Sequence, residues 1–159
     1  MTTARDADLA GLRAAIEQAR IGAREGGVPI GAALVADDGT VLGAGHNRRV
    51  QMNSAIRHGE TDALENAGRL PASVYRRSTM YTTLSPCDMC TGAILLYGIP
   101  RVVMGENLTF VGGEDYLRAR GVEVINLDSQ ECVDLMNEFI AAHPEIWYED
   151  IGESREALS

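Results

Sequence analysis

The chain has 159 residues, of which 45% are apolar, a composition that fits one globular domain with a single core. It carries 23 acidic and 14 basic residues, for a net charge of −9, and every basic residue is arginine. The absence of lysine excludes Schiff-base chemistry and the lysine-containing phosphate-binding loop, and the acidic balance disfavours tight binding to a nucleic-acid backbone.

The excess negative charge is concentrated towards the C-terminus. Residues 1–126 contain 14 acids and 13 arginines, whereas residues 127–159 contain nine acids and one arginine. The first eight residues lack the basic start and apolar run of a secretory signal, and no window reaches 18 consecutive apolar residues. We therefore expect a cytoplasmic protein with no membrane or nucleic-acid partner.

The N-terminal part predicts a helix followed by two antiparallel strands. The helix is indicated by apolar residues at steps of three and four, namely Leu9, Leu12, Ile16, Ala19 and Ala23. Gly26 and Gly27 supply the left-handed stop that ends it. The apolar run 30–36 and the segment 41–44 flank the hairpin turn signal at positions 38–39, so these two strands should pair.

Strands and helices alternate after this hairpin. Residues 47–57 are polar and irregular and predict a loop. The rest predicts helices over 58–68, 87–97, 115–120 and 129–142, and strands over 79–84, 101–104 and 122–127. A hairpin followed by this alternation predicts an α/β fold, with a mixed five-stranded sheet covered by helices on both faces. We expect a single domain over residues 1–159.

Two short segments carry metal-binding residues. His58 begins one predicted helix, and Cys87 and Cys90 lie in the first turn of another, after Pro86. Zinc accepts neutral imidazole and thiolate ligands, and the positive end of a helix stabilises thiolates. No other His or Cys is an obvious fourth ligand. Three protein ligands are typical of catalytic zinc sites, which keep one position for water.

Glu60 follows His58 by two residues, where it is placed to act on that water rather than to bind the metal. H-x-E followed by P-C-x-x-C is the signature of zinc nucleobase deaminases. A thioredoxin-like redox pair also contains C-x-x-C, but it gives no role to His58 or Glu60. Half of a structural zinc knuckle is a further alternative, but its other half is absent.

Several runs of the sequence resemble the cytidine deaminase superfamily, and in particular the small cytosine deaminases of the fungal type. These runs are Glu25–Gly31, Tyr81–Gly92, Tyr97–Arg101, Gly105–Asn107 and Trp147–Glu153, of which the last is the most discriminating. The resemblance implies a three-layer α/β/α sandwich, a homodimer and one zinc ion per subunit. It also implies the hydrolysis of cytosine to uracil and ammonia, a step of pyrimidine salvage.

The same resemblance implies roles for matching residues. Zinc would be bound by His58, Cys87 and Cys90, and Glu60 would carry protons from the water to the ring and to the leaving amine. The resemblance also implies a substrate-binding set. The ring carbonyl edge would be bound by Asn47 and the Gly59 backbone N–H, and the exocyclic amine by the Ser85 carbonyl and Asp150. The ring would pack on Phe110 and Trp147, with Ile30 and Leu84 along the wall. We expect residues 143–159 to form an acidic lid segment.

The sequence departs from the fungal pattern near the pocket. Val50 stands where those enzymes carry a phenylalanine that helps to wall the pocket, and Arg57, Thr61 and Asp62 also differ. Loss of an aromatic wall would enlarge the pocket or move its lid, so triazines, isocytosine and guanine-type rings are alternative substrates. A transfer-RNA adenosine deaminase, disfavoured by the acidic C-terminal part, and a non-catalytic zinc-binding module are the other classes considered.

Overall fold

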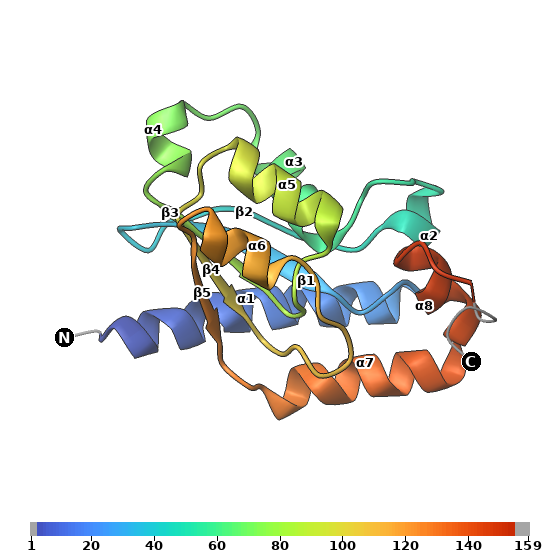
Figure 1. Cartoon of the computed structure of the whole chain (residues 1–159). Helices are drawn as coiled ribbons and strands as arrows, with labels where there is room; N and C mark the ends of the chain where they lie inside the picture. Colours follow the sequence, from blue (N-terminus) through green and yellow to red (C-terminus); the bar gives the residue numbers. More distant parts are fainter. Residues whose placement is uncertain (1–2, 155–159) are drawn as a thin grey trace.

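The computed structural model describes residues 3–154, which include a five-stranded sheet with helices on both faces (Figure 1). The strands are β1 (Gly31–Ala36), β2 (Val41–His46), β3 (Ser78–Thr82), β4 (Arg101–Met104) and β5 (Glu123–Asn126). Their order is β2-β1-β3-β4-β5, with β1 antiparallel to both of its neighbours and β3, β4 and β5 mutually parallel. The mixed sheet predicted from the sequence is confirmed.

Five helices correspond to those that the sequence predicts. They are α1 (Ala4–Arg24), α3 (Gly59–Ala67), α5 (Asp88–Leu96), α6 (Glu114–Ala119) and α7 (Gln130–Ala142). Three more were not predicted: α2 (Arg49–Met52), α4 (Ala72–Tyr75) and α8 (Pro144–Asp150). None of these three exceeds seven residues, which is too short for a periodic apolar pattern to develop. Within residues 3–154, no helix combines the length and the apolar character needed to cross a membrane.

The layers are held together by a core on each face of the sheet. Helices α1 and α7 cover one face, and α3, α5 and α6 cover the other (Figure 1). Successive residues of β3 alternate between them: Met80 joins the cluster that includes Ile94 of α5, and Tyr81 joins the cluster that includes Ile16 of α1 and Cys132 of α7. The predicted three-layer α/β/α sandwich is therefore confirmed.

The ends of four strands meet at one edge of the sheet. Gly31 at the start of β1 pairs with His46 at the end of β2. Thr82 at the end of β3 pairs with Ala32 on one side and with Met104 at the end of β4 on the other. Because the connections that follow β2, β3 and β4 all leave from this edge, residues far apart in the sequence come together there.

Glycines in β2 allow α3 to lie close to the sheet. A Cβ atom at Gly43 would meet the Ala63 carbonyl oxygen at 2.5 Å, and one at Gly45 would meet the Ala63 backbone nitrogen at 2.6 Å. A larger residue at either position would push the helix away from the strand. This close contact fixes the position of the helix that begins with Gly59 and Glu60.

The buried face of α1 differs from the predicted apolar stripe. Leu9 is 45% exposed, and Ala23 is also exposed. Asp8 is buried instead, where it accepts a hydrogen bond from the Tyr81 hydroxyl at 2.9 Å and two from the Arg101 guanidinium at 2.6 and 2.7 Å. The helix is therefore rotated so that this polar cluster, and not Leu9, faces the sheet.

Asp8→Asn tests the contribution of this cluster to stability. The hydrogen bonds from Arg101 hold the pKa of Asp8 below its usual range, against the opposing effect of burial. A lowered folded-state pKa stabilises the protein above the unfolded-state value of about 4, and this stabilisation is lost as the pH falls through the folded-state value. We expect the substitution to lower the free energy of unfolding by about 2 kcal/mol at pH 7, and by less below about pH 4, in urea denaturation experiments.

Glu123→Gln is the matched control, because Glu123 also contacts Arg101 but its side chain is 62% exposed. We expect it to change the free energy of unfolding by no more than about 0.5 kcal/mol. If Asp8→Asn destabilised the protein equally at neutral and at acidic pH, the charge of Asp8 would not be the source of the effect.

Candidate active site

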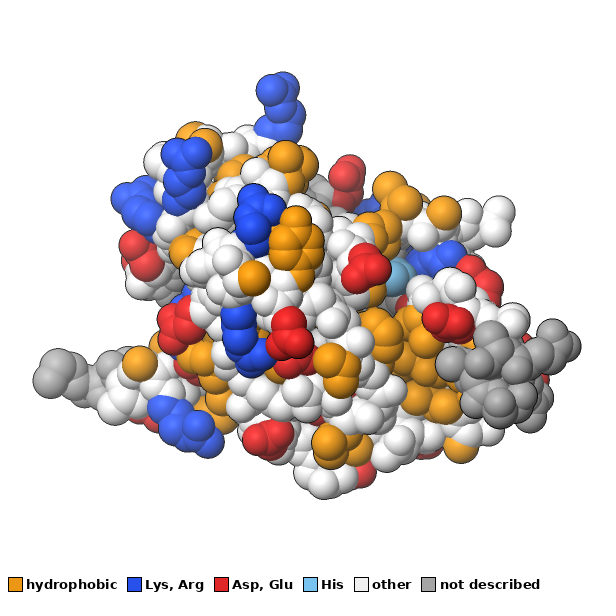
Figure 2. Space-filling model, viewed as in Figure 1, with side chains coloured by type: hydrophobic (Ala, Val, Ile, Leu, Met, Phe, Trp, Pro, Cys, Tyr) orange, Lys and Arg blue, Asp and Glu red, His pale blue; other side chains and the backbone are white. Residues whose placement is uncertain are grey.

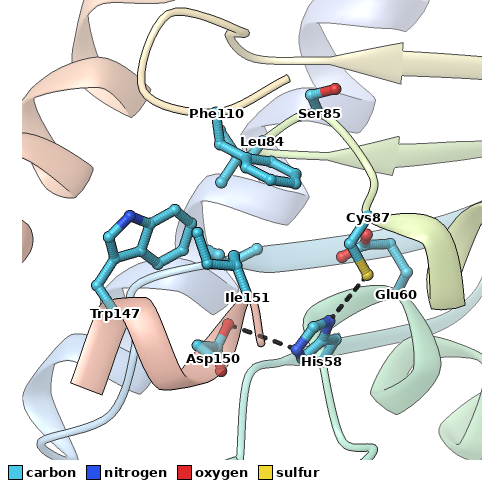
Figure 3. Close-up of a pocket in the computed structure, with 10 residues that line it drawn as sticks. His58, Glu60, Leu84, Ser85, Cys87, Phe110, Trp147, Asp150 and Ile151 are labelled. Carbon is cyan, nitrogen blue, oxygen red and sulfur yellow. Dashed lines mark hydrogen bonds and ion pairs between the residues drawn. The ribbon is translucent and has the colours of Figure 1, made fainter. Parts of the chain in front are cut away.

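Two helix N-termini bring the predicted metal ligands together. His58 is the N-cap of α3 and Cys87 is the N-cap of α5, both with extended backbone, and Cys90 lies in the first turn of α5. His58 Nδ1 lies 3.3 Å from Cys87 Sγ (Figure 3) and 3.7 Å from Cys90 Sγ. The ligand atoms of all three residues lie within 4.8 Å of one another.

The spacing of these donor atoms fits zinc. With Zn–N and Zn–S bonds of about 2.0 and 2.3 Å, a tetrahedral ion separates an imidazole nitrogen from a thiolate sulfur by about 3.5 Å. The two observed separations, 3.3 and 3.7 Å, lie on either side of this value. Thiolate and imidazole are also donors that favour zinc over magnesium or calcium. The three side chains can therefore supply three of the four ligands of a zinc ion.

The three ligand side chains have different shifts in pKa. The hydrogen bond from Cys90 lowers the pKa of the Cys87 thiol to about 4, and the same bond raises the pKa of Cys90 well above its usual range. Burial disfavours the charged form of His58, but the hydrogen bond with Cys87 and the charge of Asp150 outweigh burial and raise the pKa of His58 to about 9. A metal ion that binds here must displace the protons on His58 and Cys90.

Glu60 lies in the first turn of α3, beside these ligands. It is only 4% exposed, and its side chain lies next to Cys87 (Figure 3). Burial, and then the charge of Cys87, raises the pKa of the Glu60 carboxyl to about 7. A carboxyl group with a pKa near neutrality can both accept and return a proton, which is the requirement for general acid–base catalysis.

Asn47 and Asp150, both predicted to bind substrate, meet beside His58. Asn47 is fully buried after β2, and its side-chain amide donates to Asp150 Oδ1 at 3.0 Å. Asp150 lies in α8, and its Oδ2 atom is 3.4 Å from His58 Nε2 (Figure 3). These contacts bring together residues that are separated by about a hundred positions in the chain.

Arg49 completes this polar group, although no role was predicted for it. Its guanidinium donates to Glu149 Oε1 and Oε2 at 2.8 and 2.6 Å and to Asp150 Oδ1 at 3.3 Å. Its backbone N–H also donates to Asn47 Oδ1 at 3.0 Å. No local signal could have identified this role, because an arginine in a polar loop does not show which distant carboxylate it reaches.

A small cavity lies next to the metal ligands. The predicted residues Ile30, Leu84, Phe110 and Trp147 line it, together with Ile151, which was not predicted. The Phe110 and Trp147 rings meet edge to face, with centroids 6.0 Å apart and an interplanar angle of 88°. They lie across the cavity from His58 and Cys87 (Figure 3), so the cavity has a polar, ligand-bearing side and an aromatic side.

Ser85 and Gly59 occupy positions set by tight backbone contacts. Ser85 lines the cavity, while its hydroxyl donates to Glu114 Oε2 at 2.6 Å and accepts from the Gly112 backbone N–H at 2.9 Å. Gly59 is the first residue of α3, where a backbone N–H has no partner within its own helix. A Cβ atom at Gly59 would lie 3.2 Å from the Ile30 carbonyl oxygen, so the helix start closely approaches β1.

Val50 does not wall this cavity, which corrects the expectation drawn from the sequence. It lies in α2, is 45% exposed, and lines a separate surface hollow with Asn53, Ser54 and Glu149. The aromatic side of the cavity is formed by Phe110 and Trp147 instead. A valine in α2 therefore does not enlarge the cavity.

The fold and the site together define a class of protein. A three-layer α/β/α sandwich holds one histidine and two cysteines at zinc-binding distances, with a buried carboxyl group beside them and a small cavity in front. This combination is that of a zinc-dependent hydrolase of the deaminase type.

Residues 5–106 match the family described as the cytidine and deoxycytidylate deaminase zinc-binding region, and the chain belongs to this family. It is 60% identical over 146 residues to cytosine deaminase from Candida albicans, covering 92% of this chain and 97% of that protein. It is 36% identical over 108 residues to tRNA-specific adenosine deaminase from Streptococcus pyogenes, covering 67% of each. A solved structure of guanine deaminase from Nitrosomonas europaea matches with a TM-score of 0.69 at 25% identity, covering 83% of this chain and 84% of that one.

Cys87→Ser tests the metal site directly. A serine hydroxyl stays protonated at neutral pH and does not replace a thiolate ligand, so we expect the purified variant to contain much less than one zinc ion per chain. Cys132→Ala is the matched control, because this cysteine is 1% exposed within the α1–α7 core and should leave the zinc content unchanged. Zinc is measured by elemental mass spectrometry, and full occupancy in Cys87→Ser would contradict the assigned ligand set.

Proposed function

We propose that this chain catalyses the zinc-dependent hydrolysis of cytosine to uracil and ammonia. The observation that carries the proposal is the position of Glu60, buried beside the metal-ligand side chains at one side of a small cavity. The 60% identity to a cytosine deaminase, over 92% of the chain, supports cytosine as the substrate.

In this proposal, different residues of the site bind the substrate and transfer protons. Bound zinc supplies Lewis acidity, which makes water nucleophilic near neutral pH. Glu60 accepts one proton from the attacking water and delivers it to the ring nitrogen. It then takes the second proton of that water, from the hydroxyl group added to the ring carbon, and passes it to the leaving amine. Asn47 and the Gly59 backbone N–H orient the carbonyl edge of the ring. The Ser85 carbonyl and Asp150 orient the exocyclic amine.

Residues 143–159 form the lid in this proposal. Within the described part of this segment, Trp147 and Asp150 of α8 line the cavity, whereas Glu145 and Glu149 are exposed. The contact between Trp147 and Phe110 excludes water from the ring and so strengthens the polar interactions inside. Residues 155–159, which were included in the predicted lid, lie outside the described residues.

The mouth of the cavity favours a free base over a nucleotide. Asp88, Glu149 and Glu153 line the mouth together with Val111, and acidic and hydrophobic side chains surround a hollow on this face of the molecule (Figure 2). A phosphate group would meet like charges here, whereas a neutral base would not. Arg49 also lines the mouth, but its guanidinium is already paired with Glu149.

A guanine-type ring is the second candidate substrate, because a guanine deaminase shares this fold over most of both chains. Isocytosine and triazines belong to the same group of aminated heterocycles. Editing of transfer RNA is less well supported, because the net charge of −9 opposes contact with a phosphate backbone.

We also propose that the chain is one domain that works as a cytoplasmic homodimer, with neither a nucleic-acid nor a membrane partner. A protein interface is supported by exposed hydrophobic side chains near the site, namely Met52, Ile56, Leu108 and Val111. Sedimentation equilibrium tests the dimer, and a monomer at micromolar concentration would contradict it.

Glu60→Gln tests the proton-transfer role. The amide keeps the size of the side chain but cannot carry a proton, so kcat for cytosine should fall by at least about 100-fold while zinc stays bound. Glu65→Gln is the control, because this residue lies in the same helix and is exposed. Ammonia release is measured with cytosine, isocytosine, guanine, ammeline and cytidine. Activity that survived in Glu60→Gln would contradict the mechanism, and a wild-type protein inactive on cytosine would overturn the substrate.

Asp150→Asn tests recognition of the exocyclic amine. The substitution keeps the size of the side chain and removes the charge that faces His58, so kcat/KM for cytosine should fall by about 100-fold, or roughly 3 kcal/mol of transition-state stabilisation. The neighbouring Glu149→Gln provides the comparison, because Glu149 binds Arg49 at the exposed side of α8 and should matter much less. Equal losses in the two variants would mean that Asp150 acts only in holding α8.

A further inference from the structure

A buried carboxylate outside the cavity organises one wall of the site. Asp62 of α3 is fully buried, and its oxygens accept hydrogen bonds from the His46 backbone N–H at 3.0 Å and from Arg48 Nε at 3.2 Å. They also accept from Arg57 Nε at 3.1 Å and from a terminal nitrogen of the same guanidinium at 2.7 Å. One carboxylate thus binds two guanidinium groups and one backbone amide.

These donors lie at the two ends of a single segment. His46 and Arg48 flank its start, after β2, and Arg57 is its last residue, immediately before His58. The ends are also joined directly, because the Arg48 backbone N–H donates to the Arg57 carbonyl at 2.9 Å. We call Asp62 with Arg48 and Arg57 the loop clamp, since together they close residues 47–57 into a loop and tie it to α3.

The loop held by this clamp carries the polar contacts of the lid. Asn47 donates to Asp150, and Arg49 donates to both Asp150 and Glu149. A shift at the base of the loop would therefore move the groups that set the position of Asp150.

The contact between Arg57 and Asp62 is central to the clamp. Arg57 Nε and a terminal nitrogen of the same guanidinium both donate to Asp62 Oδ1, at 3.1 and 2.7 Å. Hydrogen bonds between charged groups are stronger than those between neutral groups. Arg57 and Asp62 therefore form one linked unit at the base of the loop.

We propose that Asp62 is a positioning residue for substrate binding. It acts through the loop clamp to hold Asn47 in contact with Asp150, and so sets the polar side of the cavity before the substrate enters. This proposal rests on the proposed function, because it takes Asn47 and Asp150 as substrate-binding residues.

A buried ion cluster can also contribute to folding alone, and the two roles predict different results. A residue that only stabilises the fold would lower the melting temperature and leave the KM of the remaining folded enzyme unchanged. A positioning residue would raise KM and loosen the 47–57 loop in protein that is still folded and still binds zinc. The experiment must therefore measure binding and local protection separately from global stability.

The test compares Asp62→Asn with Glu65→Gln, which removes one negative charge from the exposed part of the same helix. Asparagine keeps an acceptor for the His46 amide and loses the charge that holds the two guanidinium groups. In zinc-bound Asp62→Asn we expect KM for cytosine to rise by about tenfold, which is 1.4 kcal/mol, with kcat changed less than about threefold. Glu65→Gln should match the wild type in both constants.

Amide hydrogen exchange followed by mass spectrometry gives a readout that does not need activity. Peptides covering residues 47–57 should exchange at least about tenfold faster in Asp62→Asn than in wild type, while peptides from α7 stay unchanged. Should Asp62→Asn fail to fold, Arg57→Leu is the second variant. It removes the two hydrogen bonds from Arg57 to Asp62 and leaves Asp62 bound to Arg48. It should show the same changes to a smaller extent.

A lower melting temperature with wild-type KM and unchanged exchange in the 47–57 loop would overturn the positioning role. A wild-type enzyme that does not act on cytosine would overturn the proposed function instead, and the exchange measurement would then decide on the loop clamp by itself. Faster exchange across the whole chain, rather than in the 47–57 loop, would also contradict the proposal, because it would mean a general loss of stability.

Discussion

The site depends on the meeting of two helix N-termini at one edge of the sheet. His58 and Cys87 are N-caps, so their side chains leave the helices at the end where backbone N–H groups point outward and favour negative charge. A thiolate is favourable there for the same reason. Gly43 and Gly45 let α3 lie close to β2, which fixes the position of one of the two helices. Backbone packing therefore sets the donor separations of 3.3 and 3.7 Å before any metal binds.

The ligands and Glu60 could be predicted because their signal is local. The spacing of Cys87 and Cys90 is one helical turn, and Glu60 follows His58 on the same helix, so each relation is determined by helix geometry over a few residues. The mixed sheet was equally accessible, since a hairpin followed by alternating strands and helices allows few arrangements. The residues Asn47, Phe110 and Trp147 carried no such signal and were recognised through the family resemblance alone.

The remaining features could not be read from the sequence, because they depend on which distant groups meet. Arg49 and Asp62 belong to polar stretches that look solvated, yet Asp62 is fully buried and Arg49 reaches α8. Leu9 fits an apolar stripe and is nevertheless exposed, since Asp8 takes the buried position to bind Arg101. Val50 was expected at the wall of the pocket from the family resemblance, but it lies on the surface in the structure. For Arg49, Asp62 and Asp8, a polar pairing across the fold outweighs the local pattern.

These contacts give the acidic C-terminal part a structural role. Helix α8 has seven residues, and a helix of that length is not stable in water without packing. Burial of Trp147 holds one side of it, and Asn47 and Arg49 hold the carboxylate of Asp150. Trp147 and Asp150, whose contacts hold the helix, therefore also line the cavity. In the proposed function, positioning of the substrate amine and packing of α8 over the ring depend on the same contacts. Part of the charge of this segment is thus buried inside the protein rather than exposed to solvent.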